Sequence, residues 1–315
     1  MKILFTADIH IKLGQKSVPV AWAKNRYDML FNALVTQQNN CDIFIVGGDT
    51  FDRVPTIEEI ELFFDFVTRC TIPTYIYSGN HEALKKNTTF LTNLKNTVNL
   101  LNKKVHIIDD FESVENIDFI PYNKLKDYTQ TNNNFSGNIL CTHVRGEIPP
   151  HVKPEVDLSI FDKWQVVLAG DLHSYENSQL NILYPGSPVT TSFHRTKVDT
   201  GVIILDSETL EHTWIKLELP QLIRKTIGVG DIPEPTDYDL TIYEVEGDIS
   251  ELGSLQDSEL IDKKILKKDT DTTLILSNEM SLAEEVSEYM RYVLQLNEEV
   301  IAEALQELNN NLSSV

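Results

Sequence analysis

Short apolar runs alternate with amphipathic segments along the first half of the chain. The runs are rich in Ile, Val, Leu, Phe and Tyr, a composition that is typical of buried strands. Between the first three runs, residues 26–38 and 56–69 carry apolar side chains at steps of three and four, which predicts two helices. This alternation indicates a layered α/β fold. The predicted strands span residues 2–7, 42–46, 73–78, 138–142 and 165–169.

From about residue 105 the chain is rich in predicted strands and poor in predicted helices. A second sheet packed on the first accounts for this change, because each sheet then buries one apolar face against the other. The fold class that we expect is therefore α/β: a two-sheet α/β sandwich with a small α+β capping domain and a C-terminal helix. The further predicted strands of the sandwich span residues 118–121, 180–184, 201–205 and 213–217.

The pattern changes near residue 219 and again near residue 279, which divides the chain into three predicted parts. Residues 1–219 form the sandwich domain, residues 220–278 the capping domain, and residues 279–315 the C-terminal amphipathic helix. Within the capping domain we expect strands at 222–227, 239–245 and 272–277 and a helix at 250–260.

The last segment carries a clear helix signal. Ser281 stands three residues before Glu284, which is the spacing of a capping box. From Leu282 to Leu308, apolar residues recur at steps of three and four. This pattern predicts one long helix with a continuous apolar face.

Composition is ordinary for a globular protein of about two domains, with 41% apolar and 24% charged residues. Asp8 and His10 interrupt the apolar N-terminus, and no run approaches the roughly 20 apolar residues of a membrane span, so we expect neither a signal peptide nor a membrane partner. Cys41, Cys70 and Cys141 lie in or beside apolar segments without metal-site spacing, which predicts buried, reduced thiols. We expect a cytoplasmic protein, in the host cytoplasm if a phage encodes it.

The formal net charge of −21 argues at first against a nucleic-acid partner, since proteins that bind phosphate backbones usually carry a basic surface. The acids are unevenly distributed, however. Residues 220–315 hold 21 Asp and Glu against 7 Lys and Arg, which leaves 27 acids and 20 bases in residues 1–219. Most of the excess acid therefore lies in the C-terminal third, and the objection to DNA is weaker for the first 219 residues.

Five polar motifs occur in a fixed order, mostly at the ends of predicted strands. Their Asp, Asn and His side chains are ligands for divalent metal ions. Strand ends place them on loops, where open α/β proteins have their binding sites. Two adjacent ions need a shared ligand as well as separate ones, and a carboxylate at a strand end suits the shared position. The motifs are Asp8-x-His10, Gly48-Asp49-x-x-Asp52, Gly79-Asn80-His81-Glu82, His143 and Gly170-Asp171-x-His173.

In this order the motifs resemble the signature of the calcineurin-like metallophosphoesterase superfamily: DxH, GDxxD, GNH(D/E), a lone His and GHxH. The resemblance covers about residues 1–190 and implies a metallophosphoesterase domain that holds two divalent metal ions. It also implies the ligands: Asp8, His10 and His173 for one ion, Asn80, His143 and Asp171 for the other, and Asp49 as the bridge.

Three further motif residues are expected to support the ions. The resemblance implies that His81 is a catalytic residue and not a ligand, placed to stabilise the transition state and to give a proton to the leaving oxygen. Imidazole, with an ordinary pKa of about 6.5, can donate a proton at neutral pH. We expect Glu82 to orient or charge His81, and Asp52 to hold the metal-binding loop by hydrogen bonds.

At Asp171 the sequence departs from the family, which has a histidine at this position. A carboxylate is anionic and a harder ligand than imidazole, so we expect Mn²⁺, with Mg²⁺ as the alternative, in preference to zinc. In the other interpretation, Asp171 faces solvent and the second ion is held weakly.

Two further segments resemble the SbcD-type DNA nucleases: Gly48-Asp49-Thr50-Phe51-Asp52, and Tyr184-Pro185-Gly186-Ser187-Pro188 followed by Ser192-Phe193. The short chain resembles a phage version of that subfamily. The resemblance implies a manganese-dependent DNA exonuclease with endonuclease activity that acts in DNA recombination, repair or replication. It also implies a DNA-binding type of capping domain.

The same resemblance implies protein partners. The chain has no GxxxxGK[ST] motif, so ATP hydrolysis would come from an SbcC-type coiled-coil ATPase, which residues 281–308 would bind through their apolar face. In the alternative, this helix packs on the capping domain. A homodimer is also implied, and a helix with Tyr27, Leu30 and Leu34 is a candidate for its apolar surface.

Two other functions stay open on sequence alone. A phosphoesterase of small molecules or phosphoproteins would use the same metal ions and would explain the acidic charge directly. A structural subunit with a decayed site is the third hypothesis, for which Asp171 is the only support.

Overall fold

The computed structural model describes residues 1–84, 88–128, 135–236, 238–256, 258, 260–266, 280–294 and 296–312. The chain forms two compact units. The first contains Met1–Glu244 and Gln256–Lys263, and the second contains Val245–Leu255 and Lys264–Val315. The predicted strand at 272–277 lies outside the described residues.

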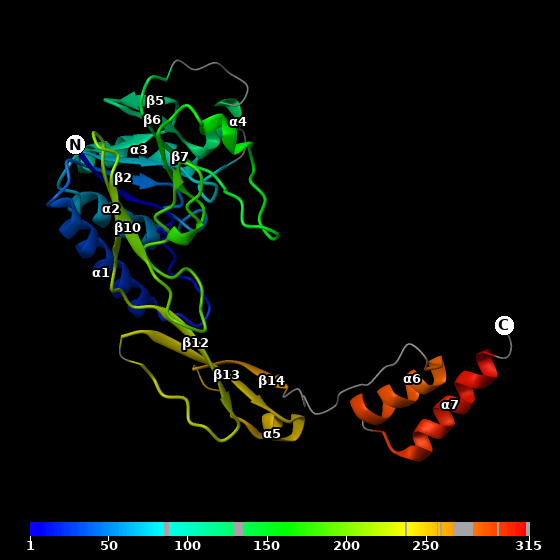
Figure 1. Cartoon of the computed structure of the whole chain (residues 1–315). Coiled ribbons are helices and arrows are strands. Elements are labelled where there is room, and N and C mark those ends of the chain that lie inside the picture. Colours follow the sequence, from blue (N-terminus) through cyan, green and yellow to red (C-terminus); the bar gives the residue numbers. More distant parts are fainter. Residues whose placement is uncertain are drawn as a thin grey trace. The chain divides into compact units, whose positions relative to one another are not determined.

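A six-stranded sheet, in the order β11-β10-β1-β2-β3-β4, forms the centre of the first unit (Figure 1). β1 to β4 are parallel, whereas β10 pairs antiparallel with β1 and β11 with β10. Parallel strands end at the same edge, so the loops that follow β1, β2 and β3 lie together. The strands are β1 (Lys2–Thr6), β2 (Ile43–Gly47), β3 (Thr74–Tyr77), β4 (Val105–Ile108), β10 (Gly201–Asp206) and β11 (His212–Lys216).

Three helices cover one face of this sheet: α1 (Val20–Gln38), α2 (Ile57–Arg69) and α3 (Phe90–Leu101). The two helices predicted from periodicity, at 26–38 and 56–69, are confirmed, although α1 begins earlier. Their apolar side chains join one buried cluster with the sheet. That cluster includes Tyr27, Leu30 and Leu34, so the prediction that these three supply an exposed dimer surface is wrong.

The other face of the first sheet packs on a second, five-stranded sheet in the order β5-β6-β7-β8-β9. Phe5 and Tyr77 from one sheet and Phe119 and Cys141 from the other are buried in the same apolar cluster. The predicted two-sheet α/β sandwich is therefore confirmed. The strands are β5 (Glu112–Val114), β6 (Ile117–Ile120), β7 (Ile139–His143), β8 (Val166–Gly170) and β9 (Ile182–Leu183), and β6 to β9 are parallel.

Short helical segments, namely α4 (Tyr122–Tyr128) and the 3-10 turn η1 (Leu158–Phe161), pack on the outer side of this second sheet. A further 3-10 turn, η2 (Tyr175–Asn177), follows β8. The ring of Tyr175 in η2 stacks on Trp214 of β11, with ring centres 5.5 Å apart. The loop after β8 is thus anchored to the first sheet as well.

A three-stranded sheet follows, made of β12 (Leu222–Gly228), β13 (Leu240–Gly247) and β14 (Ile261–Leu266), with the short helix α5 (Ile249–Ser254). The predicted strands at 222–227 and 239–245 are confirmed. The predicted helix at 250–260 is shorter, because the chain is extended at Leu255 and then enters β14, a strand that the periodicity did not predict.

A buried carboxylate ties this sheet to the segment after β9. Glu244 on β13 is fully buried, and its oxygens lie 2.7 Å from the Arg195 guanidinium and 2.7 Å from the Lys263 ammonium. Arg224 on β12 approaches to 3.5 Å. Three cations around one carboxylate offset the cost of removing its charge from water.

The C-terminal segment forms α6 (Leu282–Glu288), a π-helical turn (Tyr289–Val293) and α7 (Glu298–Leu312), so the prediction of one continuous helix is wrong. The Ser281 capping box is present as predicted. The break occurs because Asn297 starts a new helix, with its side-chain oxygen accepting from the Val300 N–H at 3.0 Å. None of the helices described is long and apolar enough to cross a membrane.

The three cysteines are free thiols. Cys70 and Cys141 are buried, as predicted, whereas Cys41 is half-buried. Burial raises the pKa of the Cys70 thiol to about 12, so this side chain stays protonated and unreactive at neutral pH.

Candidate metal centre

The polar motifs meet where parallel strands of both sheets end. Asp8 and His10 follow β1, Asp49 follows β2, and the loop after β3 carries Asn80 and His81. The second sheet contributes His143 from the end of β7, and Asp171 and His173 from the loop after β8.

Backbone geometry fixes the first two loops to each other. The Asp8 N–H donates to the Gly48 carbonyl at 3.1 Å, and the His10 N–H donates to the Asp49 carbonyl at 2.9 Å. Asp8, His10 and Asp49 all have positive φ, at 56°, 48° and 48°. Non-glycine residues seldom adopt this region, and such strained positions gather at functional sites.

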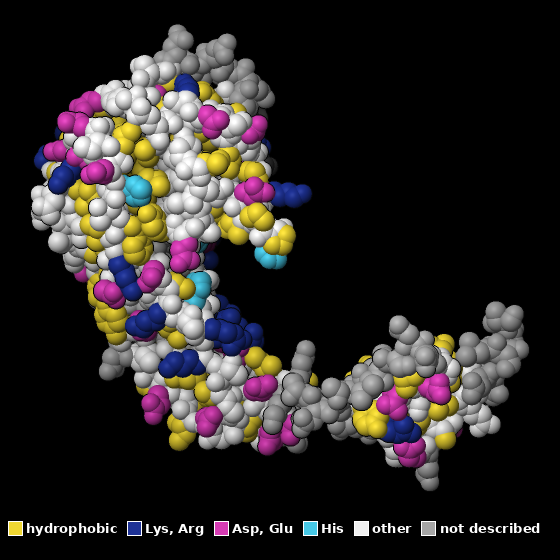
Figure 2. Space-filling view, viewed as in Figure 1, with side chains coloured by type: hydrophobic (Ala, Val, Ile, Leu, Met, Phe, Trp, Pro, Cys, Tyr) yellow, Lys and Arg dark blue, Asp and Glu magenta, His cyan; other side chains and the backbone are white. Residues whose placement is uncertain are grey.

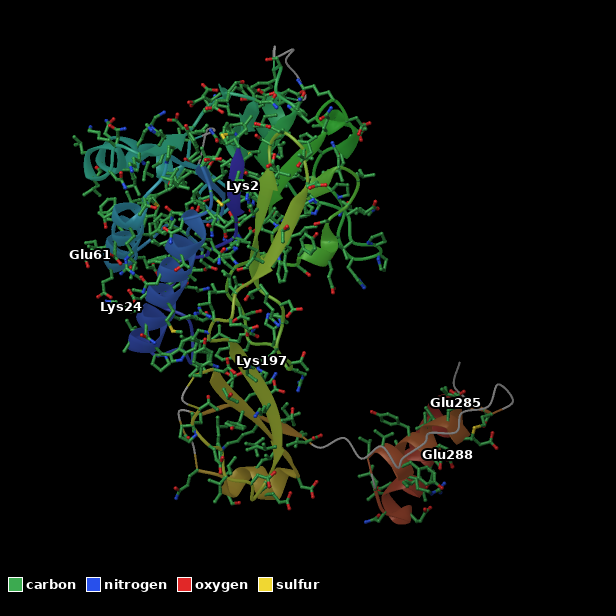
Figure 3. The ribbon with its side chains drawn as sticks, turned by 60° about the vertical axis from the view of Figure 1, so that its left-hand side comes forward. Lys2, Lys24, Glu61, Lys197, Glu285 and Glu288 are labelled. Atoms are coloured by element: carbon green, nitrogen blue, oxygen red, sulfur yellow. The ribbon has the colours of Figure 1, made fainter. Side chains whose placement is uncertain are left out.

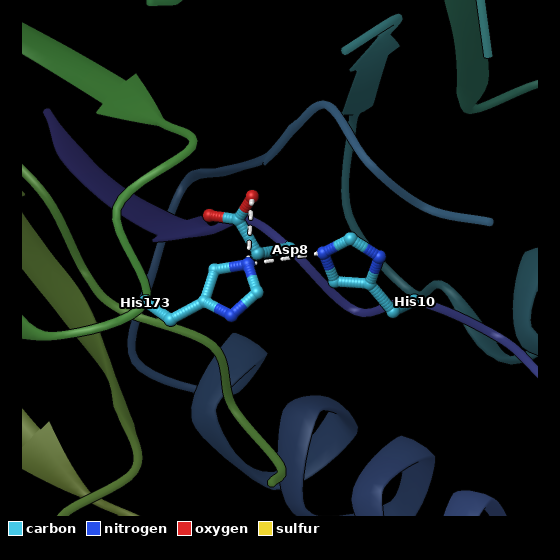
Figure 4. A group of neighbouring side chains, drawn as sticks. All are labelled: Asp8, His10 and His173. Atoms are coloured by element: carbon cyan, nitrogen blue, oxygen red, sulfur yellow. Dashed lines mark hydrogen bonds and ion pairs between the residues drawn. The ribbon is translucent and has the colours of Figure 1, made fainter. Parts of the chain in front are cut away.

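Asp8, His10 and His173 form the first cluster of candidate ligands (Figure 4). The Nε2 atoms of His10 and His173 lie 3.1 Å apart, and His173 Nε2 is 3.9 Å from an Asp8 oxygen. Asp8 and His10 are buried. Two imidazole nitrogens and a carboxylate oxygen that converge in this way suit a divalent ion, because each presents a lone pair to the same point.

Asp49 belongs to two further groups of candidate ligands, one with Asp8 and His143 and the other with His10 and His81. One oxygen of Asp49 is 3.7 Å from His10 Nε2 and 3.5 Å from His143 Nε2. A single carboxylate thus reaches ligands of both predicted ions. This is the arrangement that a bridging ligand requires, and Asp49 remains the predicted bridge.

His143 and Asn80 face each other in the second half of the site. His143 Nδ1 lies 2.9 Å from the Gly47 carbonyl, to which a neutral ring donates its proton. Its Nε2 then presents a lone pair 2.9 Å from the Asn80 side-chain oxygen. With the Asn80 oxygen on this side, a proton on Nε2 or a metal ion would hold the two atoms together; a turned amide would donate to Nε2 instead.

The pKa values of the buried groups show the same need for cations. Burial by itself would lower the pKa of His143. Attraction to Asp49 and other carboxylates is stronger, and the pKa of His143 is raised to about 10. Burial by itself would raise the pKa of Asp49. Attraction to His143 and a hydrogen bond from it are stronger, and they hold the pKa of Asp49 well below its ordinary value. Burial raises the pKa of Asp8 well above its ordinary value. Divalent ions would neutralise these carboxylates, so the residues fit the metal ions that the motifs predict.

Glu82 supports the loops and not the His81 ring. Its buried carboxylate accepts from the backbone N–H groups of Asp49, Phe51 and Gly79, at 3.1, 2.8 and 2.8 Å. These bonds join the loops after β2 and β3. No contact in the described part of the chain joins Glu82 to the His81 ring, so the orientation of His81 by Glu82 stays a prediction.

Asp52 lies beside His10, with a carboxylate oxygen 3.7 Å from His10 Nδ1. Its other oxygen is 2.7 Å from the Lys12 ammonium. Asp52 thus faces the ring nitrogen that points away from the metal cluster. The separation is longer than a hydrogen bond, and His10 Nδ1 has no hydrogen-bond partner in the described part of the chain.

His81 lies at the open side of the site, with 38% of its side chain exposed. Its Nδ1 contacts the Asp52 carbonyl, and its backbone N–H donates to Asp49 at 2.9 Å. Its Nε2 is left 3.8 Å from an Asp49 oxygen, facing the clusters. A histidine held in this way can pass a proton to a group bound at the ions while it remains in contact with solvent.

Asp171 contacts an arginine that the motif analysis missed. The Arg145 guanidinium binds both oxygens of its carboxylate, with Nε 3.1 Å from Oδ2 and Nη2 3.3 Å from Oδ1. Asp171 is absent from the groups of candidate ligands found among the described residues. Arg145 stands two residues after His143, beyond the end of β7, and none of the five motifs includes it.

Other contacts that the motif analysis missed hold the ligands in place. The Ser187 hydroxyl donates to the Asp8 carbonyl at 2.7 Å, and the Tyr27 hydroxyl donates to the His10 carbonyl at 2.7 Å. Thr191 lies 3.3 Å from His173 Nδ1. The Gly186-Ser187 segment, which carried part of the family resemblance, therefore packs directly against the metal-binding loop.

An open cavity of about 590 Å³ lies beside the first cluster, within the first unit. Most of its lining residues have polar or charged side chains, and the cavity lies next to His173. The lining includes His173, Tyr175, Thr191, His194, Lys197 and Trp214. Lys197, labelled in Figure 3, lies on the segment between β9 and β10.

Comparison with known proteins supplies independent evidence. The family model of calcineurin-like phosphoesterases matches residues 1–181. The protein named probable exonuclease subunit 1 of Escherichia phage T5 is 44% identical over 310 residues, covering 95% of this chain and 94% of that one. A protein of Invertebrate iridescent virus 6, named as a phosphoesterase, is 27% identical over 255 residues, covering 73% of this chain and 86% of its own.

Proposed function

The chain belongs to the calcineurin-like phosphoesterase family, and we propose that within this family it is a metal-dependent DNA nuclease subunit, an exonuclease with endonuclease activity. One observation carries the proposal. The likeness to the phage T5 protein named as an exonuclease subunit extends over 95% of the chain, past the phosphoesterase domain and into the terminal segment. A shared catalytic domain alone would not explain a match of that length.

The proposed site holds two divalent ions, Mn²⁺ or Mg²⁺. Such ions would polarise a phosphodiester and activate a water for attack on phosphorus. In the proposal the ligands are Asp8, His10 and His173 on one side, Asn80, His143 and Asp171 on the other, and Asp49 between them. Asn80 and Asp171 enter through their closeness to His143 Nε2, at 2.9 and 3.9 Å. The convergent ring nitrogens and the buried carboxylates described above support this ligand set.

His81 provides the proton in the proposed reaction. Its Nδ1 donates to the Asp52 carbonyl, so the doubly protonated ring has its second proton on Nε2, from which it can pass to the departing oxygen. Contact with solvent lets the ring regain its proton between turnovers. Glu82 and Asp52 act by positioning, the first through the loop backbones and the second beside His10.

DNA is the proposed substrate in spite of the acidic charge. Figure 2 shows Lys and Arg side chains gathered over the region of β12, in the same unit as the metal centre. Arg195, Lys197 and Lys263 all have more than half of their side chains exposed, at 64%, 66% and 51%. Lys263 lies on the proposed capping domain at 220–278, whereas Arg195 and Lys197 lie between β9 and β10. All three also pair with a carboxylate, Glu244 or Asp239, and in the proposal their exposed parts would contact the phosphate backbone as well.

The C-terminal segment is the proposed binding site for an SbcC-type coiled-coil ATPase. The phage T5 relative is named as a subunit, which supports a partner. Tyr289, Val293 and Leu294 are each close to half exposed on the segment that leaves α6, and Val300 on α7 is 43% exposed. Apolar side chains on short helices suit a groove between partner helices. A homodimer and a role in DNA recombination, repair or replication complete the proposal.

The test compares two substrates and two histidines. Purified protein is assayed with Mn²⁺ on linear double-stranded DNA and on bis(4-nitrophenyl) phosphate, as wild type, His81→Ala and the exposed control His106→Ala. We expect His81→Ala to lower DNA turnover by about 10²–10⁴-fold, because a proton donor is lost, and His106→Ala to leave it unchanged.

Cleavage of the small diester without cleavage of DNA would overturn the proposed substrate and favour a small-molecule phosphoesterase. DNA cleavage that survives His81→Ala would overturn the role of His81. Absence of both activities in the wild type would favour a structural subunit.

A further inference from the structure

The second half of the metal centre contains a charge pair that the first half lacks. Asp171 is bound by Arg145 through both carboxylate oxygens, at 3.1 and 3.3 Å. The Asp171 side chain is only 7% exposed, whereas that of Arg145 is 45% exposed. The carboxylate is therefore part of the buried site, and the guanidinium enters it from the solvent side.

Asp171 is fixed by its backbone. Its N–H lies 3.1 Å from each oxygen of Asp8, a predicted ligand of the first ion. Its φ is 106°, which non-glycine residues rarely adopt, so the loop holds the residue against its own preference. One oxygen of Asp171 is 3.9 Å from His143 Nε2, on the same side as Asn80. The carboxylate thus points to where the second ion is predicted.

Arg145 has the freedom that Asp171 lacks. Its side chain is long and nearly half exposed, and its backbone N–H donates to Glu155 at 3.1 Å. That second carboxylate lies close enough to offer the guanidinium another partner if Asp171 is taken. A guanidinium keeps its charge at all ordinary pH values, so deprotonation will not release it from Asp171. Only another cation can replace it.

We propose that Arg145 is a displaceable cation of the second metal site, which neutralises Asp171 until a divalent ion takes its place. Binding of the second ion then requires exchange of one cation for another on the same carboxylate. The first cluster, where the described contacts of His10 and His173 involve no arginine or lysine, needs no such exchange. The two ions therefore bind in order, with the second weaker. This inference rests on the proposed two-metal function and adds how the second site is filled.

The proposal is tested by whether loss of the Arg145 guanidinium strengthens or weakens binding of the second ion. Loss of the guanidinium leaves Asp171 buried without a cation, which strengthens binding of the second ion if Arg145 competes with it. If Arg145 instead holds Asp171 in a ligating position, its loss weakens the second ion. Competition and positioning thus predict opposite results from one substitution.

The experiment is a titration of the full-length, metal-free protein with Mn²⁺ and without substrate. Electron paramagnetic resonance measures free Mn²⁺ and the coupling between paired ions, so the readout does not depend on catalysis. Arg145→Gln removes the charge, and Arg145→Lys keeps it on a side chain that binds fewer oxygens. Arg53→Gln is the matched control, because Arg53 is 42% exposed and lies 3.1 Å from buried Glu59.

We expect Arg145→Gln to tighten the second Mn²⁺ by about tenfold or more, Arg145→Lys to have a smaller effect in the same direction, and Arg53→Gln to change neither ion. If Arg145→Gln does not fold, tightening by Arg145→Lys supports the proposal, and weakening or no change overturns it. Thermal unfolding with and without Mn²⁺ gives a second readout, since tighter binding raises the stabilisation by the metal.

The outcomes separate this inference from the proposed function. Two ions in the wild type, with unchanged or weaker second-site binding in Arg145→Gln, overturn the inference and leave the two-metal function standing. One ion in the wild type and two in Arg145→Gln support it in its strongest form. One ion or none in every protein overturns both.

Discussion

The two halves of the metal centre contain the same kinds of side chain but differ in what neutralises them. In the first half, the nitrogens of His10 and His173 face each other at 3.1 Å beside the buried Asp8. In the second half, both oxygens of Asp171 are taken by Arg145. The candidate ligands of the first half can thus bind an ion without displacing a side chain, whereas in the second half the guanidinium of Arg145 already occupies a ligand. Sequence motifs identify ligands of both halves alike, but only contacts show which ligands already have a partner.

Loss of Asp49 should weaken metal binding in both halves of the metal centre. Its carboxylate lies within 3.7 Å of ring nitrogens in both, so Asp49→Asn should weaken both ions and lower turnover by about 10³-fold or more. Mn²⁺ titration and DNA turnover measure the effect, with far-ultraviolet circular dichroism as the control for folding. Loss of only one ion would show that Asp49 belongs to one half.

Substitution of Asp52 should change metal binding in the first half alone. Its carboxylate lies near Nδ1 of His10, the nitrogen away from the cluster. Removal of such a support lowers metal affinity by about 10- to 100-fold, and we expect Asp52→Ala to weaken the first ion by that amount. The Mn²⁺ titration of the variant provides the measurement. An equal loss at both ions would mean that the loop, and not His10, depends on Asp52.

Glu82 should affect both halves of the metal centre, because it joins the loops after β2 and β3. Its titration should make the stability of the metal-free fold depend on pH. Burial and then repulsion from Asp49 raise the pKa of Glu82 to about 7, from an ordinary 4.5. A carboxyl group with a raised pKa stabilises the metal-free fold fully below the unfolded value, and this contribution is lost as pH rises through about 7.

Glu82→Gln removes this titration. We expect the metal-free wild type to lose on the order of 2 kcal/mol more stability than Glu82→Gln between about pH 5 and pH 8. Urea unfolding in the presence of a chelator, at several pH values, measures the slope separately from the overall loss caused by weaker backbone hydrogen bonds. Equal slopes for the two proteins would contradict a raised pKa at Glu82.

Much of the fold followed from the sequence because its elements are strongly patterned. The strand that ends before Asp8 and the helix capped at Thr56 have local signals that agree with their surroundings. The C-terminal segment shows the limit of such signals. Its apolar period continues past residue 294, yet Asn297 caps a new helix there, because a side chain that satisfies free N–H groups competes with continuation. Tyr27, Leu30 and Leu34 likewise show that an apolar stripe does not reveal whether it is exposed.

The sequence by itself indicated the type of chemistry, since Asp, Asn and His at the ends of apolar strands are the side chains that divalent ions bind. It also determined the two-sheet architecture, because buried strands need a period and a length that are written locally. Only the tertiary structure decided how the ligands are neutralised: the loops after β7 and β8 are distant in sequence, and their approach pairs Arg145 with Asp171. Charge pairing depends on distances of a few ångströms between such loops, and no local pattern along the chain encodes those distances.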